Sequence, residues 1–145
     1  DKIDTIVVES FTSLIEIIFR EADVRYKGFD VWSYYNKEID KILDKSKNSD
    51  KYVVFTAIDG VYDGDNGVEE RYVAVDGNRW KKRVEKEFVL ALFTDVRATD
   101  DGVTYRFRTN TTGRDSAKSP MDMFESLHID NCIKSIIDKC EEYYK

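Results

Sequence analysis

The sequence predicts an α/β protein with a partly parallel sheet, flanking helices and an antiparallel edge. Two short β-rich segments, 6–8 and 52–57, are separated by two stretches in which apolar residues recur at helical spacing. A connection of that length favours a crossover that leaves the two strands parallel. Residues 104–108 alternate between aromatic and basic side chains, which is typical of an antiparallel strand with one exposed face.

The helices are expected at 11–22 and 32–43, separated by a break at Lys27-Gly28. Ser10 or Thr12 is available as the cap of the first helix. A third amphipathic helix is expected to include Ile129 and to end near Cys140. His128 precedes it, without a second metal ligand or a nucleophile at a suitable spacing, so a catalytic role for this histidine is not expected.

Between these elements the sequence is less regular. Residues 59–66 are acidic and glycine-containing, which favours a mobile turn-forming insertion rather than an element. Residues 80–87 form a short basic stretch with helical character, and the apolar run 88–93 is expected to be a central strand. Residues 109–120 are expected to form a loop that presents Arg114 and Lys118 on a flexible support.

Length and composition indicate one globular domain over residues 1–145. No apolar run is long enough for a bilayer, and no cleavable signal is visible, so we expect a soluble cytoplasmic protein without a membrane partner. Cys132 and Cys140 are interpreted as reduced core thiols. A net charge of −6 argues against a surface that binds polyphosphate everywhere, but it leaves room for a local basic patch.

Glu9 is the first candidate for a functional residue, because it directly follows the apolar segment 6–8, which is typical of a buried strand. In open α/β sheets ligands bind at the carboxyl ends of the strands, and a carboxylate there suits a nucleotide-bound Mg²⁺. The alternative is a buried strand that ends at an ordinary acidic surface residue.

The order of these segments resembles the second half of a RecA-like P-loop ATPase. More narrowly, it is similar to the phage AAA-type proteins related to the single-strand-annealing and recombination ATPases. The matching segments are 4–10 as a Walker B strand, 26–32 before the second helix, Thr56-Ala57 at a sensor-like strand end, 84–94 as a core strand, and 116–120.

The resemblance implies ATP and Mg²⁺ as cofactors and assigns roles to five residues. Glu9 would be catalytic and hold the metal shell, with Ser10 beside it at the nucleotide. Thr56 would act as a polar sensor of the γ-phosphate, whereas Lys118, and Arg114 with it, would reach a nucleotide across a subunit boundary in a homo-oligomer. The structural alternatives are a capping hydroxyl for Ser10, a strand-end threonine for Thr56 and a solvated loop cation for Lys118.

The chain departs from this family in one decisive respect. It contains no Gly-x-x-x-x-Gly-Lys-Ser/Thr motif, so the backbone nest that holds the β- and γ-phosphates is missing, and the chain is not expected to hydrolyse ATP alone. We expect an N-terminal P-loop segment, or another polypeptide, to complete the site. The relatives often have His after Thr-Ala, where this chain has Ile58-Asp59.

A basic cluster is the candidate for binding single-stranded DNA. It comprises Arg79, Trp80, Lys81, Lys82 and Arg83, with the indole available for stacking on a base. The alternative is a solvated face of a helix with Trp80 in the core.

The preferred interpretation is therefore the C-terminal part of a RecA-like ATPase that binds ATP-Mg²⁺ and single-stranded DNA in phage-type recombination or replication. It would be an ATPase only when completed by a P-loop segment. The alternative is a non-enzymatic α/β interaction or structural module of a phage assembly.

Overall fold

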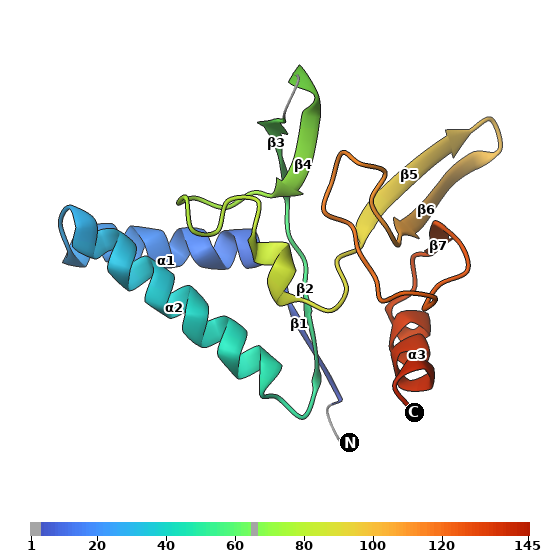
Figure 1. Ribbon diagram of the computed structural model, residues 1–145, viewed down its shortest axis with the longest axis horizontal. Coiled ribbons are helices and arrows are strands. Elements are labelled where there is room, and N and C mark those ends of the chain that lie inside the picture. Colours follow the sequence, from blue (N-terminus) through green and yellow to red (C-terminus); the bar gives the residue numbers. More distant parts are fainter. Residues whose placement is uncertain (1–3, 65–66) are drawn as a thin grey trace. The chain divides into compact units, whose positions relative to one another are not determined.

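The computed structural model describes residues 4–64 and 67–145 and shows a mixed α/β protein (Figure 1). The chain divides into two compact units. The first consists of the residues up to Tyr62 together with Tyr72–Glu87, and the second of Asp63–Arg71 and Phe88–Lys145. The expectation of a single domain over 1–145 stays a prediction. The sheets are small, partly parallel and partly antiparallel, which confirms the coarse fold class.

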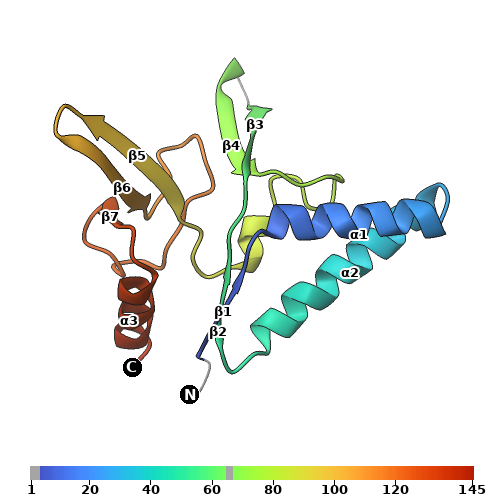
Figure 2. The ribbon, with the colours of Figure 1, turned by 180° about the vertical axis from the view of Figure 1, so that it is seen from behind.

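Two helices dominate the first unit, α1 (Phe11–Arg25) and α2 (Phe29–Lys47), and they pack against each other (Figures 1 and 2). Their apolar residues recur every three or four positions, so each helix buries one stripe. The buried residues of this stripe are Phe11, Ile15, Ile18 and Ala22 on α1 and Val31, Tyr35, Ile39 and Leu43 on α2. Both helices and the break before Phe29 were predicted from the sequence, and the structure confirms them.

Strands β1 (Thr5–Val8) and β2 (Tyr52–Phe55) flank this helix pair in sequence and pair in parallel, with Val8 opposite Phe55. The predicted crossover is therefore confirmed. The predicted burial of the first strand is wrong, since Ile6 is 43% and Val7 56% exposed. The reason is that, among the described residues, β1 has only β2 as a strand neighbour.

Strands β3 (Asp59–Asp63) and β4 (Glu69–Val73) form a hairpin after β2. The prediction that 59–66 is not an element is therefore wrong for its first five residues, and positions 65–66 lie outside the described part of the chain. Backbone pairing with β4 outweighs the low β-propensity of Asp and Gly here. A turn then leads to a 3₁₀ helix at Val84–Glu87, within the stretch predicted to have helical character.

The second unit contains an antiparallel sheet in the order β5 (Phe93–Thr99), β6 (Gly102–Arg108) and β7 (His128–Asp130), followed by helix α3 (Ile133–Tyr143). The antiparallel strand predicted at 104–108 is confirmed. Only one of its two aromatic side chains is buried, since Phe107 lies in the core whereas Tyr105 is 61% exposed.

Two predictions about this unit are wrong. The apolar run 88–93 is not a central strand: regular pairing begins only at Phe93, and Ala91 makes an isolated bridge to Lys118. Ile129 belongs to β7, where it pairs with Phe107, and not to the final helix. In both cases the pairing partners, which are distant in sequence, decide the conformation.

Among the helices of the described residues, none combines the length and apolar character needed to span a membrane. Cys132 and Cys140 are free thiols, but Cys132 is exposed at the start of α3, so its assignment to the core is wrong.

Candidate functional site

The carboxyl ends of β1 and β2 bring Glu9, Ser10 and Thr56 to one edge of the parallel pair. The Thr56 N–H donates to the Val8 carbonyl at 3.1 Å, and the Phe11 N–H donates to the Thr56 carbonyl at 2.7 Å. These two bonds connect the end of β2 to both sides of the Glu9-Ser10 dipeptide. The proximity expected from a parallel crossover is therefore confirmed.

Ser10 is the N-cap of α1. Its hydroxyl oxygen accepts a hydrogen bond from the Ser13 N–H at 3.1 Å, and the peptide bond between Glu9 and Ser10 is cis. The capping role, one of the two readings of this residue, is thus established. A nucleotide contact by the same hydroxyl stays a prediction.

Glu9 has an exposed side chain, and among the described residues no hydrogen bond or ion pair holds its carboxylate. No group of three or more His, Cys, Asp or Glu in the described parts of the chain could hold a metal ion. Mg²⁺ commonly needs only one or two protein carboxylates when phosphates and waters complete its shell. Glu9 thus suits a phosphate-bound Mg²⁺, but it does not form a metal site by itself.

Thr56 is exposed, and its hydroxyl makes a long contact of 3.5 Å to the Val8 carbonyl. This contact ties the side chain to the strand end only weakly. The hydroxyl therefore has hydrogen-bonding capacity left for a ligand at this edge, and its sensor role stays a prediction.

Arg114 and Lys118 lie in the second unit, on the segment between β6 and β7. This segment is held at several points, in contrast to the flexible support that was expected. The Arg108 guanidinium pairs with Asp115 at 2.8 Å, and the Lys118 backbone exchanges two hydrogen bonds with Ala91. The Arg108–Asp115 pair is largely buried, with side-chain exposures of 17% and 2%.

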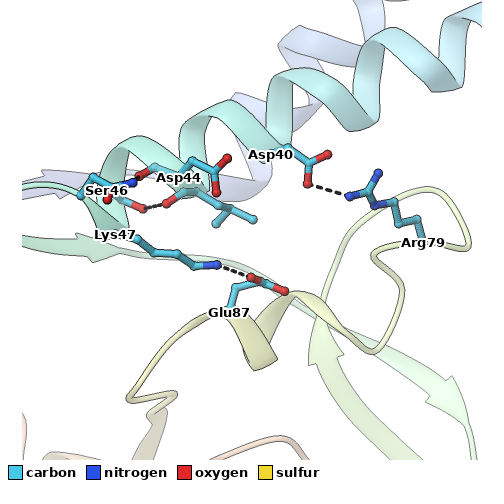
Figure 3. A network of polar contacts seen from close by, with 8 residues as sticks. Asp40, Asp44, Ser46, Lys47, Arg79 and Glu87 are labelled. Carbon is cyan, nitrogen blue, oxygen red and sulfur yellow. Dashed lines mark hydrogen bonds and ion pairs between the residues drawn. The ribbon is translucent and has the colours of Figure 1, made fainter.

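The basic cluster 79–83 lies in the first unit, in the turn that precedes the 3₁₀ helix. Ion pairs tie this region to α2: Arg79 contacts Asp40 at 2.7 Å, and Lys47 contacts Glu87 (Figure 3). One of the five residues predicted to bind DNA is thus already engaged with a carboxylate.

Trp80 is only 5% exposed, so its ring lies in the core. This agrees with the alternative interpretation of the basic cluster, in which Trp80 is a core residue. Lys81, Arg79 and Arg83 are exposed, whereas Lys82 is half-buried. The two lysines instead contact the rings of two tyrosines that were not predicted as site residues. The Nζ atom of Lys81 lies 5.0 Å from the centre of the Tyr62 ring, and that of Lys82 lies 5.4 Å from the centre of the Tyr72 ring.

A groove of about 390 Å³ lies on the first unit beside these contacts. Its walls include Thr12, Glu16, Tyr35, Tyr62, Asp76 and Lys81. A second, more open groove on the second unit is lined by Val103, Thr104, Tyr105, Asp130 and Asn131. Neither groove is lined by Glu9, Ser10 or Thr56.

His128 has a partner across the antiparallel sheet. It lies in β7, and its Nε2 contacts Asp95 of β5 at 2.7 Å. The pair connects the two outer strands of this sheet, and the absence of a catalytic role stays a prediction.

Comparison with known proteins found no match: no family model, no curated protein and no solved structure is significantly similar to this chain.

Proposed function

We propose that this chain is the C-terminal part of a RecA-like ATPase whose nucleotide site is completed by a P-loop on polypeptide outside this sequence. One observation carries the proposal. Glu9, Ser10 and Thr56 converge at the carboxyl edge of two parallel strands that are joined by a helical crossover. This edge is where open α/β sheets bind ligands.

The residues at the edge have the chemistry that a nucleotide-bound Mg²⁺ requires. The Glu9 carboxylate would bind the metal or one of its waters, and the Thr56 hydroxyl would hydrogen-bond a phosphate oxygen or the attacking water. ATP-Mg²⁺ supplies the phosphoryl group and the metal charge. The N-terminus of α1 adds a favourable partial positive charge near the same edge.

Lys118 and Arg114 are proposed to stabilise charge on the transferred phosphoryl group of a neighbouring subunit in a homo-oligomer. The Arg108–Asp115 pair supports this role, because it fixes the backbone that presents both cations. Phage-type recombination or replication on single-stranded DNA is the proposed setting.

The test joins this chain to a P-loop-bearing segment, preferably the one encoded beside it, and measures Mg²⁺-dependent ATP hydrolysis. Glu9→Gln should lower kcat on the order of 100-fold, a loss typical of removing one group that stabilises the transition state. Asp23→Asn removes an exposed carboxylate of α1 and should leave kcat unchanged. Full activity of the Glu9→Gln protein would refute the proposal.

The second candidate is a non-enzymatic α/β interaction or structural module. It is favoured by the lining of the two grooves, which does not include Glu9. Absence of ATP hydrolysis in every completed protein, with an intact fold, would support this candidate.

A further inference from the structure

Two tyrosines and two lysines of the first unit form a compact surface that we name the Tyr–Lys platform: Tyr62, Tyr72, Lys81 and Lys82. Tyr62 lies on β3 and Tyr72 on β4, and their rings pack edge to face with centroids 6.1 Å apart. Each ring carries one lysine ammonium over its face. Both rings are half-buried, so each is anchored and still reachable from solvent.

Two features of the local backbone accommodate and hold the Tyr62 ring. A Cβ added at Gly60 would lie 3.2 Å from the Tyr62 hydroxyl oxygen, so the absence of a side chain there leaves room for the ring. The Tyr62 hydroxyl donates to the Val73 carbonyl at 3.3 Å, which fixes the ring on the hairpin.

Lys82 adds an independent observation, because its φ is 59°. A left-handed conformation costs a non-glycine residue about 1 kcal/mol or more, and strain of this kind concentrates at functional sites. The strained residue is the one whose ammonium lies over Tyr72. A glycine would adopt this backbone without steric strain, so the turn itself does not require a lysine here.

We propose that the Tyr–Lys platform binds single-stranded nucleic acid, with bases stacked on Tyr62 and Tyr72 and the lysines contacting the neighbouring phosphates. Aromatic faces interleaved with cations are the combination by which proteins hold single strands without sequence preference. The proposal rests on the single-stranded DNA partner of the proposed function. It moves the stacking role from the buried Trp80 to the two tyrosines.

Charge fixes the orientation of the strand. Glu16 and Asp76 line the groove together with Tyr62 and Lys81, and the two carboxylates would repel a phosphate inside it. A base, which is uncharged and has amino groups that can donate to carboxylates, therefore fits the groove side. The phosphates then lie outside the groove, where the long flexible side chains of Lys81 and Lys82 can follow them.

The test uses the full chain, without nucleotide, and a fluorescein-labelled oligothymidylate of about 20 nucleotides, longer than one compact domain covers. Binding is followed by fluorescence anisotropy at low salt. Tyr72→Ala should weaken binding about 10-fold, within the range for loss of one stacked base, and Tyr72→Phe should restore it. Tyr105→Ala, an exposed tyrosine of the second unit, is the matched control and should have no effect.

Lys82→Gly separates a binding role from a structural one. The variant should unfold at a urea concentration no lower than the wild type, because glycine relieves the positive φ. It should nevertheless bind the oligonucleotide more weakly and lower the slope of log K against log salt by about 0.7, the contribution of one phosphate contact on a single strand. Lys45→Gln, on α2, should change neither quantity.

Three results would overturn the proposal: no binding by the wild-type chain, equal binding by wild type and Tyr72→Ala, or equal losses in Tyr72→Ala and Tyr105→Ala. The assay contains no ATP, so its outcome is independent of the ATPase test. If binding depends on the tyrosines but the chain joined to a P-loop segment hydrolyses no ATP, the nucleic-acid site is supported and the proposed ATPase is refuted.

Discussion

The parallel pair β1–β2 of the first unit and the antiparallel sheet β5–β7 of the second unit both expose apolar side chains, but they differ in strand direction. In the second unit the antiparallel strands β5 and β6 expose Val96 and Tyr105, which lie opposite each other on the face that also carries the buried Phe107. In the first unit the parallel strands β1 and β2 also expose apolar side chains, Ile6 and Val7. Parallel strands in other proteins are covered on both faces and belong to larger sheets.

The backbone of β1 has one unpaired edge. The Asp4 and Val8 carbonyls accept hydrogen bonds from β2, so the alternate residues Thr5 and Val7 direct their backbone groups to the other side. Among the described residues no further strand pairs there. The antiparallel sheet also has two outer strands, β5 and β7, that each pair with one neighbour, so the two sheets differ in strand direction and not in completeness of pairing. In other proteins a parallel pair lies inside a larger sheet, and for this reason the proposed function expects further polypeptide to extend it.

The largest effect is expected in the second unit, from Asp115→Ala. The substitution leaves the Arg108 guanidinium largely buried without its carboxylate, and the loss of one partner of a buried pair costs about 3–5 kcal/mol. Hydrogen exchange of the β6 amides measures this cost. Tryptophan fluorescence reports on the first unit at the same time, because Trp32 and Trp80 both belong to it.

Asp138→Ala is the matched control, since its ion pair with Lys134 is exposed and contributes little to stability. Equal losses in the two variants would show that the Arg108–Asp115 pair does not hold the segment that carries Arg114 and Lys118.

In the first unit, Ile39→Ala should cost about 3 kcal/mol. Ile39 is fully buried between the helices, and truncation of such a side chain leaves a cavity. Urea unfolding followed by tryptophan fluorescence measures the loss. A cost below about 1 kcal/mol would mean that the helix pair is loosely packed. The helices, and not only the parallel strands, would then need the added polypeptide for their stability.

Completion of the sheet gives the third prediction. When a P-loop-bearing segment is supplied, the Val7 amide should exchange at least about 10-fold more slowly, because a new strand would accept its N–H. The amides of β6 should not change. An unaltered Val7 amide in an active completed protein would place the added polypeptide elsewhere.

The smallest effect is expected from Ser10→Ala, which removes the cap of α1 and should cost about 1 kcal/mol in the urea unfolding experiment. Ser13→Ala keeps the capping oxygen and should cost less. If the two substitutions cost the same, the hydroxyl of Ser10 contributes nothing to the start of the helix.

Local patterns sufficed to predict α1, α2 and the parallel pairing of β1 with β2, since helical periodicity and a long crossover are properties of contiguous sequence. They failed where distant residues decide. Ile129 fits the spacing of the final helix but pairs with Phe107, and the run 88–93 has the composition of a buried strand but only one bridge, at Ala91.

The same distinction applies to the sites. The proximity of Glu9 and Thr56 follows from strand direction, so the sequence predicted it. The contact of Lys81 with Tyr62 depends on how the turn before the 3₁₀ helix folds onto the hairpin, and the buried position of Trp80 depends on packing against distant residues. The positive φ of Lys82 carries no signal in the sequence either.

The central claim is that Glu9 faces a nucleotide-bound metal once the site is completed. The most direct measurement adds Mn²⁺ and an ATP analogue to the isotope-labelled chain joined to its P-loop segment and records paramagnetic broadening of the amide signals. The account predicts that the signals of Glu9, Ser10 and Thr56 broaden first and that Glu9→Gln suppresses the effect. Broadening centred on other residues, with these three signals unchanged, would contradict it.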